Sequence, residues 1–377
     1  MNSAVKVREI STKPDKLAFV RMMWDIYKDD PNWIPPLEMD RMKLINEEKN
    51  PYYKHAKTKW YLAERDGKIV GRIMATVNDN YIKEQNENAG FFGFFECIDD
   101  ISVAKALFEP AEKFLRDNGM KVAYGPASPS SNDEYGLLIN GYDRPPVLLM
   151  TYNPRYYESL IERSGYKKDH DLFAYLLSQE TAASDKLVRV TKAMAERNKI
   201  TVRAFDKKHF DAEVEIIKHI YNTAWENHGF VPFNADEMEF LAEDLKQIYD
   251  PDLVLFAEVD GRPVGFALSL PDINQAFHAG PRIPRGWLNL PVGLWNMLTK
   301  KKAIDTVRVF VLGVLKEYRG RGVDAMLYTE TMQRAKQKGY QYGEASWVQE
   351  SNIPMNRAAQ MMNGVKYKTY RVYRKDL

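Results

Sequence analysis

Residues 309–337, VFVLGVLKEYRGRGVDAMLYTETMQRAKQ, are the stretch that decides the fold of this chain. An apolar segment typical of a β-strand is followed by a short loop and then by a segment with the periodicity of an amphipathic helix. The loop ends in Arg319, Gly320, Arg321 and Gly322, directly before the expected helix. The sequence therefore predicts a strand that is joined to a helix through a loop rich in glycine and arginine.

This loop has the composition of a phosphate-binding site. The first turn of a helix presents backbone N–H groups without intrahelical partners and a partial positive charge, and both favour an anion. Gly320 and Gly322 can adopt the backbone angles that aim successive N–H groups at oxygen atoms. Arg319 and Arg321 add positive charge. A surface turn explains the same residues without a ligand, but the strand before the loop and the helix after it favour phosphate binding.

The loop resembles the acyl-CoA signature of the GNAT (general N-acetyltransferase) superfamily, R/Q-x-x-G-x-G/A, in which loop amides bind the diphosphate of coenzyme A. Here the signature reads Arg319, Gly320, Arg321, Gly322, Val323 and Asp324, and the last of these stands where the family has Gly or Ala. The resemblance implies that these six residues bind acetyl-CoA or another acyl-CoA as co-substrate. It also requires that the Asp324 carboxylate turns away from the phosphates.

Length and composition describe a globular protein with more than one core. The chain has 377 residues, 45% of them hydrophobic, and a formal net charge of +2. A chain of this length exceeds the usual single hydrophobic core, so two domains are expected. The near balance of charge argues against a general nucleic-acid-binding protein, for which a concentrated basic face is typical.

The number of cysteines and the distribution of apolar residues indicate the cellular compartment in which the protein is expected. Cys97 is the single cysteine, so no intrachain disulfide can form, and the nearby Glu96, Asp99 and Asp100 disfavour a thiolate, which predicts a structural role. The start of the sequence does not resemble a signal peptide, and no run of about 18 apolar residues occurs. A cytoplasmic protein without a membrane span is expected. The sequence lacks cysteine pairs, an HExxH motif and an acidic calcium loop, so no metal site is predicted.

An internal repeat divides the chain. The segment YLAERDGKIVGRIMA at 61–75 matches LFAEVDGRPVGFALS at 255–269, 194 positions later. Each copy is typical of a hairpin whose Asp-Gly turn joins two antiparallel strands. Duplicated domains are therefore predicted at 1–180 and 201–377, joined by a linker helix within 181–200.

The order of elements expected in each half also resembles the GNAT fold. The resemblance implies two tandem GNAT-like acyl-CoA N-acyltransferase domains of mixed α/β class. In that fold the fourth and fifth strands splay apart, and the pantetheine arm of coenzyme A lies in the gap. By the resemblance, the main chain of Leu312 and Val314 pairs with this arm, and Asn352, which matches Asn153 of the first half, belongs to the cofactor site.

The first half has no equivalent of the phosphate loop. The corresponding helix start, FFECIDDISVAKAL at 94–107, carries Asp99, Asp100 and Ser102 where the second half has arginines and glycines. Each like-charge contact of a carboxylate with a phosphate would cost on the order of 1 kcal/mol near a surface. The first domain is therefore expected to be a degenerate copy with a structural or acceptor-binding role. Its loop at 124–146 is equally typical of an acceptor site and of simple turns.

The proton carriers of the family are missing from their usual positions. Acyl transfer from a thioester to an amine needs a deprotonated amine, a polarised carbonyl and a protonated leaving thiolate. The resemblance implies a Glu five residues before the motif Asn and a Tyr seven residues after it, where this chain has Trp347 and Ala359. Glu350 is the substitute candidate for the base, and Tyr367 is the candidate for the acid. A solvent-facing side chain and an ordinary strand residue explain these two as well, and water can relay a proton.

The acceptor is expected to bind beside the first helices of the second domain. Polar and aromatic side chains cluster there at Trp225, Glu226, His228 and Phe230, and after the hairpin at Asp272, Asn274 and Gln275. The insertion HAGPRIPRGWLNLPVGLWNMLTKKK at 278–302 interleaves tryptophans and leucines before three lysines. Packing across the domain interface is favoured for this insertion over a lid or a membrane-surface helix.

The sequence thus predicts an N-acyltransferase that moves an acyl group, with acetyl as the first expectation, from acyl-CoA to the amine of a small-molecule or peptide acceptor. Two alternatives stay open. Fem-like transferases share tandem GNAT folds and take an aminoacyl group from tRNA, but the phosphate loop favours coenzyme A, and no nucleic-acid partner is expected. A CoA-binding sensor that has lost its proton carriers is the non-catalytic alternative.

Overall fold

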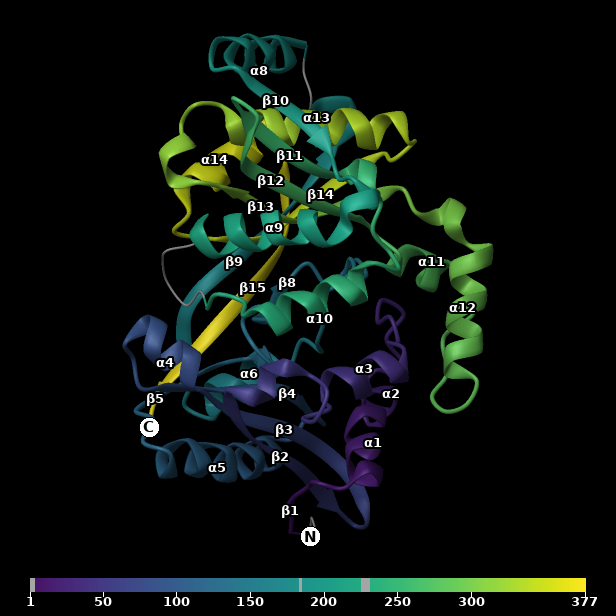
Figure 1. Ribbon diagram of the computed structural model, residues 1–377. Coiled ribbons are helices and arrows are strands. Elements are labelled where there is room, and N and C mark those ends of the chain that lie inside the picture. The colour runs from purple at the N-terminus through teal and green to yellow at the C-terminus, as the bar shows by residue number, and fades with distance from the viewer. Residues whose placement is uncertain (1–3, 183–184, 225–230) are drawn as a thin grey trace.

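The structure, a computed structural model, describes residues 4–182, 185–224 and 231–377 (Figure 1). In the first half the elements are β1 (Lys6–Glu9), α1 (Lys13–Arg21), α2 (Met23–Ile26), α3 (Glu38–Leu44), β2 (Ala56–Arg65), β3 (Lys68–Asn78), α4 (Asp79–Gln85), β4 (Ala89–Cys97), α5 (Ile101–Asp117), β5 (Val122–Gly125), β6 (Ala127–Ser128), β7 (Glu134–Tyr135), β8 (Leu137–Asn140), α6 (Tyr157–Arg163), β9 (Lys167–Ser178) and α7 (Gln179–Ala182). In the second half they are α8 (Asp185–Arg197), β10 (Ile200–Ala204), α9 (Phe210–Ala224), α10 (Ala235–Leu245), β11 (Val254–Val259), β12 (Arg262–Pro271), α11 (Asn274–Ala279), α12 (Asn289–Thr299), β13 (Thr306–Val314), α13 (Val323–Gln337), β14 (Tyr342–Gln349), α14 (Ile353–Met361) and β15 (Val365–Asp376).

In the part of the chain that the structure describes, one mixed sheet of thirteen strands runs through both halves. Its order is β1-β2-β3-β4-β5-β15-β9-β14-β13-β12-β11-β10, and β8 pairs with β15 beside this path. The mixed α/β class predicted from the sequence is confirmed. The two halves exchange their last strands, because β9 of the first half pairs with β14, and β15 of the second half lies between β9 and β5. Figure 1 shows β15, in yellow, crossing from the upper into the lower half of the molecule.

The two predicted hairpins form with matching geometry. β2 pairs with β3, and β11 pairs with β12, both antiparallel. The Asp-Gly turns have positive φ at both residues, 51° and 72° at Asp66 and Gly67 and 50° and 75° at Asp260 and Gly261. Two positive φ angles are what the tight turn between twisted strands requires, and they explain why Asp-Gly recurs there. The division at 1–180, 181–200 and 201–377 stays a prediction about sequence units, since the sheet joins them.

A long helix follows the central strand in each half. α5 packs on β2, β3 and β4, and α13 packs on β11, β12 and β13. The entrance of α5 is closed by its own residues, because the Asp100 side chain accepts hydrogen bonds from Ser102, and Arg65 Nη1 donates to Asp100 Oδ2 at 2.8 Å. These contacts lower the pKa of Asp100 to about 2, that with Ser102 contributing most. Cys97 is buried, and burial, followed by the charge of Asp100, raises the pKa of its thiol.

The insertion that contains α11 and α12 contacts the first half, as the sequence suggests, but through different residues from those expected. The side chain of Asn289 accepts from the backbone N–H of Glu38 at 2.8 Å and donates to the carbonyl of Pro36 at 3.1 Å. The tryptophans and leucines of the insertion, Trp287, Leu288, Leu294, Trp295 and Leu298, are exposed. None of the helices in the described part of the chain combines the length and the apolar character needed to cross a bilayer.

Candidate active site

The loop before α13 has the backbone of an anion cradle. Gly320 and Gly322 have φ of 72° and 88°, a region that side chains disfavour, so glycine is required there. Gly322 is the N-cap of α13, and the first helical hydrogen bond runs from the N–H of Met326 to the carbonyl of Gly322 at 2.9 Å. The N–H groups of the first turn therefore have no intrahelical acceptor. A Cβ atom added to Gly320 would meet nothing within 4 Å, so the space beside Gly320 is open, whereas one added to Gly322 would meet Met194 Cε at 2.9 Å.

The two arginines hold the loop in place. Arg319 Nε donates to the carbonyl of Val314 at 3.2 Å, and its Nη2 donates to the carbonyl of Ala224. The Arg321 guanidinium lies over the ring of Tyr318, 5.2 Å from its centroid. Asp324 is exposed in the first turn of α13. The arginines thus contribute charge near the helix start while they brace the loop against the end of β13.

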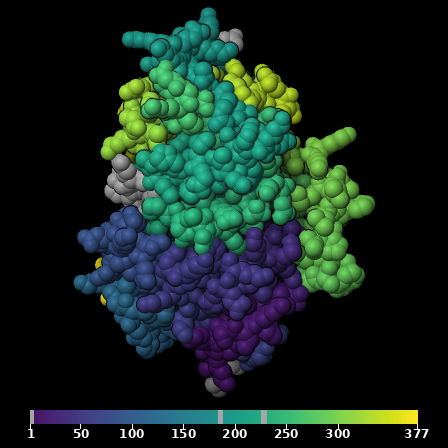
Figure 2. All heavy atoms as spheres, in the orientation of Figure 1, coloured from purple at the N-terminus to yellow at the C-terminus, as the bar shows by residue number. Residues whose placement is uncertain are grey.

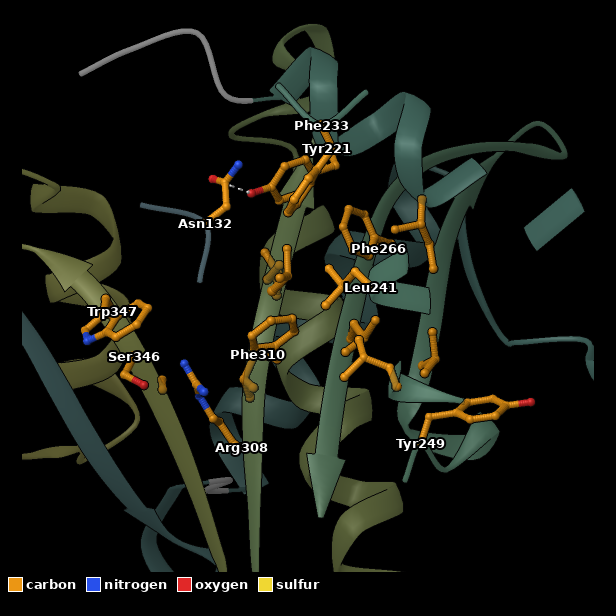
Figure 3. A pocket seen from close by; sticks show the side chains of 18 of the residues that line it. Asn132, Tyr221, Phe233, Leu241, Tyr249, Phe266, Arg308, Phe310, Ser346 and Trp347 are labelled. Carbon is orange, nitrogen blue, oxygen red and sulfur yellow. Dashed lines mark hydrogen bonds between the residues drawn. The ribbon is translucent and has the colours of Figure 1, made fainter. Parts of the chain in front are cut away.

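A gap opens beside β13 where the resemblance implies one. β13 and β14 pair in parallel only from Thr306–Tyr342 to Val309–Ala345. Beyond Val309, in the part of the chain that the structure describes, the partner of β13 is β12, whose pairing continues to Val314. The edge of β13 that faces β14 therefore carries main-chain groups that are free for a ligand. Figure 3 shows the two strands apart, with Phe310 on one and Trp347 on the other.

A cavity of about 380 Å³ occupies this gap and continues beneath α9 and α10 (Figure 3). Its walls are mainly aromatic and aliphatic side chains. They include Val214, Ile217, Leu241, Phe266, Leu268 and Phe310. Ser131 and Asn132 of the first half also line it, so the loop at 124–146 reaches the site. A cavity of this size and lining suits an apolar ligand of small-molecule size.

Polar groups gather at one end of the cavity. Glu344 is fully buried, Ser346 Oγ donates to its Oε2 at 3.0 Å, and Tyr367 Oη donates to its Oε1 at 3.3 Å. Arg308 Nε lies 3.8 Å from Glu344 Oε2. Burial raises the pKa of Glu344, and the positive charge of Arg308 opposes that shift. Because Arg308 and Ser346 line the cavity, this cluster joins the apolar space to a buried carboxylate.

The structure separates the two residues considered for proton transfer. Tyr367 lies in the buried cluster, and burial, then the charge of Glu344, raise the pKa of its hydroxyl. Glu350 accepts from Lys168 Nζ at 2.8 Å and from the N–H of Asp171 at 3.1 Å, both on β9. Neither Glu350 nor Tyr367 is among the residues that line the cavity, but Tyr367 bonds to Glu344 beside it. Both catalytic roles stay predictions.

Sequence reasoning missed Glu344, although a signal was present. In the strand YGEASWVQ, Tyr342, Glu344 and Ser346 alternate on one face of β14, so an acidic residue inside a core strand was visible. The partners Arg308 and Tyr367 come from β13 and β15, and no sequence spacing reveals that these strands meet there.

The residues expected at the cofactor lie in three different places. Leu312 and Asn352 line the cavity, and Asn352 also caps α14 by accepting from the N–H of Met355 at 3.2 Å. Val314 lies at the start of the phosphate loop, where its carbonyl accepts from Arg319. Arg319 to Asp324 surround the start of α13. The cavity and the loop therefore lie along one strand, and the role of each residue in binding coenzyme A stays a prediction.

The residues expected at the acceptor divide into two groups. Trp225, Glu226, His228 and Phe230 lie outside the described residues. Asp272 and Asn274 contact the first half, and Gln275 contacts the residue that precedes β13. Asp272 accepts from the N–H of Leu148 at 2.8 Å, and burial raises its pKa to about 7. Asn274 Nδ2 donates to the carbonyl of Pro146 at 3.0 Å, and Gln275 Nε2 donates to Asp305 Oδ1 at 2.6 Å.

The chain is similar in sequence to proteins of one acetyltransferase family. The sequence model of the Acetyltransferase (GNAT) family matches residues 215–364. The chain is 36% identical over 385 residues to a protein of Caulobacter vibrioides (strain NA1000 / CB15N) named bacterial ceramide synthase, and the match covers 100% of this chain and 98% of that protein. It is 35% identical over 380 residues to Protein YghO of Escherichia coli (strain K12), with 98% and 95% of the two chains covered.

Solved structures share the fold at low sequence identity. A tandem GNAT protein from the clavulanic acid biosynthesis pathway matches with a TM-score of 0.55 at 8% identity, over 99% of this chain and 98% of that one. A GCN5-related N-acetyltransferase from Sphaerobacter thermophilus matches with a TM-score of 0.54 at 14% identity, over 99% and 95%. At such identities the likeness concerns the fold alone, and it includes the tandem arrangement.

Proposed function

The chain belongs to the GNAT acetyltransferase family, and from this premise we propose that it transfers an acyl group from acyl-CoA to the amine of a long-chain lipid acceptor. The acyltransferase class follows from the family. We propose further that the donor is acyl-CoA and that the acceptor amine carries a long aliphatic chain. The roles given below to individual residues are also proposed.

The loop before α13 supports acyl-CoA as the donor. Its two glycines have positive φ, the space beside Gly320 is open, and only the flexible Met194 side chain lies close to Gly322 at the helix start. A diphosphate bound there would leave the pantetheine arm to run along the free edge of β13 past Leu312, toward the cavity. The thioester would then lie near the polar cluster around Ser346.

The apolar cavity is the observation that carries the proposed acceptor class. A short, polar amine such as an amino acid would leave walls such as Ile217, Leu241 and Phe266 facing water, whereas an aliphatic chain would cover them. The relative from Caulobacter vibrioides is named a ceramide synthase, and a ceramide is the product of N-acylation of a long-chain amino alcohol. The proposed acceptor is therefore a long-chain 2-amino alcohol whose amine reaches the polar end of the cavity.

The proposed chemistry is direct transfer. The amine nitrogen attacks the thioester carbonyl carbon, a C–N bond forms, the C–S bond breaks and coenzyme A leaves as a thiolate that must gain a proton. Glu344, reached through Ser346, is proposed to take the proton from the amine, and Tyr367 remains the proposed acid. Glu350 is the alternative base. Its existing bonds to Lys168 and Asp171 favour a structural role for that carboxylate.

A thiol-release assay over two series of substrates tests the proposal. One series varies the acyl-CoA from two to sixteen carbons, and the other compares a long-chain 2-amino alcohol with ethanolamine, amino acids and peptides. Thiol release that requires the long-chain amine supports the proposed acceptor. Release with short polar amines alone contradicts it, and a CoA-induced rise in melting temperature without any thiol release favours a CoA-binding sensor.

A further inference from the structure

An apolar surface without a partner lies on the insertion between β12 and β13. Trp287, Leu288, Leu294, Trp295 and Leu298 are the large apolar side chains exposed there, and we call them the outer face of α12. Trp287 is 84% exposed, more than any other large apolar side chain in the described part of the chain, and Leu298 is 71% exposed. Figures 1 and 2 show this segment, in light green, projecting from the edge of the molecule.

The helix is turned with its polar side inward. Asn289, Gly293 and Asn296 are buried, at the spacing of one helical face. Asn296 Nδ2 donates to the carbonyl of Pro281 at 2.8 Å, and a Cβ atom at Gly293 would come within 2.4 Å of Leu37 Cδ2. The Asn296 bond ties α12 to the loop of the insertion itself, whereas the bonds of Asn289 to Glu38 and Pro36 and the close contact of Gly293 with the Leu37 side chain attach the helix to the first half. The apolar side of α12 is left to face solvent, which is the reverse of an ordinary surface helix.

The insertion itself is rich in positive charge, and one of its cations, Arg285, pairs with Asp25 of the first half at 2.9 Å. No Asp or Glu occurs in the sequence between Asp272 and Asp305, whereas the segment contains Arg282, Arg285 and the run Lys300–Lys302. Lys301 and Lys302 are exposed directly after the helix. The whole chain carries a net charge of only +2, so the cations are concentrated at this site. An exposed tryptophan- and leucine-rich helix flanked by lysine suits the boundary between the headgroups and acyl chains of a bilayer.

We propose that the outer face of α12 binds the interfacial region of an anionic phospholipid bilayer, with Trp287, Trp295 and Leu298 inserted and Lys301 and Lys302 at the headgroups. A second copy of the chain fits this face less well. A two-fold contact that paired two α12 helices antiparallel would bring the run Lys300–Lys302 of one copy toward Arg282 of the other, whose guanidinium donates to main-chain carbonyls rather than to a carboxylate in the described part of the chain. This proposal does not rest on the proposed function, because vesicle binding is measured without acyl-CoA or acceptor.

Vesicle sedimentation with the full chain tests the proposal. Vesicles of phosphatidylcholine with phosphatidylglycerol are compared with vesicles of phosphatidylcholine alone. The wild type is expected to sediment with the anionic vesicles, and the triple variant Trp287→Ser, Trp295→Ser, Leu298→Ser is expected to bind at least about tenfold more weakly. The double variant Met361→Ser, Val365→Ser removes apolar side chains that are 73% and 65% exposed elsewhere and is expected to bind as the wild type does.

The charged part of the proposal has its own variants. Lys300→Gln, Lys301→Gln, Lys302→Gln together are expected to weaken binding to anionic vesicles about tenfold or more, while Lys105→Gln, Lys121→Gln, Lys336→Gln together leave it unchanged. Equal binding of the wild type to neutral and anionic vesicles would overturn the choice of an anionic surface. Quenching of tryptophan fluorescence by brominated lipids, measured on the wild type, tests the insertion without any substitution.

Three results would overturn the proposal as a whole. These are a wild type that does not sediment with anionic vesicles, a triple serine variant that binds as well as the wild type, and brominated lipids that leave the fluorescence unchanged. Sedimentation velocity provides a further test. A dimeric wild type that becomes monomeric in the serine variant would assign the outer face of α12 to a second copy of the chain.

Discussion

Glu344 is the residue on which the proposed chemistry depends. Its carboxylate has lost its hydration inside the sheet, and burial raises its pKa, while Arg308 at 3.8 Å stabilises the ionised form. Hydrogen bonds from Ser346 and Tyr367 fix its orientation. A carboxylate whose pKa is raised in this way accepts a proton more readily than an exposed one.

Replacement of this carboxylate should separate catalysis from binding. Glu344→Gln is expected to lower kcat about 100-fold or more, because an amide cannot accept the proton, while the KM for acyl-CoA changes by less than about twofold. Glu350→Gln is the matched control, since it removes a carboxylate that is held by Lys168. Steady-state kinetics of both variants distinguish the two candidates. A loss of kcat in Glu350→Gln alone would assign the base to Glu350.

The pH dependence of activity follows from the direction of the pKa shift. A base with a raised pKa loses its active, ionised form as pH falls through that pKa, so the acidic limb of kcat/KM is expected above the ordinary glutamate value of 4.5. This limb should flatten in Glu344→Gln. An identical acidic limb in the variant and the wild type would show that another group titrates.

The cavity wall is expected to decide the chain length that is accepted. Leu241→Trp would fill part of the space beneath α10, so the KM for a long-chain amine is expected to rise about tenfold, as the displaced methylene groups lose burial. The KM for a short-chain analogue should stay within about twofold. Val365→Trp, on an exposed position, is the control. An equal loss for both chain lengths would place the aliphatic chain elsewhere.

At the scale of elements, the start of α13 differs from the start of α5 in one decisive respect. α5 has a side-chain cap, because Asp100 accepts from the N–H of Ser102 and pairs with Arg65. α13 has Gly322 as its N-cap and no side-chain cap. Two helices in related positions therefore present opposite charge at their starts, and only the uncapped one can use its backbone donors for an external anion.

A negative charge placed in the loop should abolish this difference. Gly320→Asp is expected to weaken acyl-CoA binding at least about tenfold, because the new carboxylate lies in open space beside the expected phosphates. Gly339→Asp is the control, since Gly339 also has a positive φ, 91°, and open space but lies at the opposite end of α13. Isothermal titration measures both. Unchanged affinity in Gly320→Asp would refute the loop as the diphosphate site.

At the scale of the whole molecule, the exchange of strands makes the two halves one folding unit. β15 is held by β9 on one side and by β5 and β8 on the other, and Tyr370, Val372 and Tyr373 of this strand are fully buried. Neither half can complete its sheet without a strand from the other. The exchange also places β14, and with it Glu344 and Ser346, between β13 of the second half and β9 of the first.

Because the two halves share β15, they are expected to unfold together, and this can be measured. Tyr370→Ala is expected to destabilise the protein by about 3–5 kcal/mol, as for other large-to-small changes in a core. Hydrogen exchange in the β2–β3 and β11–β12 hairpins should then accelerate together, because both halves depend on β15. Met361→Ser, at an exposed position of the second half, should leave both hairpins protected. Faster exchange in the second half alone would show that the halves unfold separately.

The sequence by itself determined the features that depend on local contacts. The Asp-Gly hairpins, the glycine loop before α13 and the degenerate start of α5 all follow from backbone preferences within a few residues, and a single chain reveals them. The tertiary structure alone decided that the halves exchange strands, that Glu344 meets Arg308 and Tyr367, and that α12 turns its leucines and tryptophans outward. Those features depend on which distant segments pack together, and periodicity reports which face of an element is apolar but not what covers it.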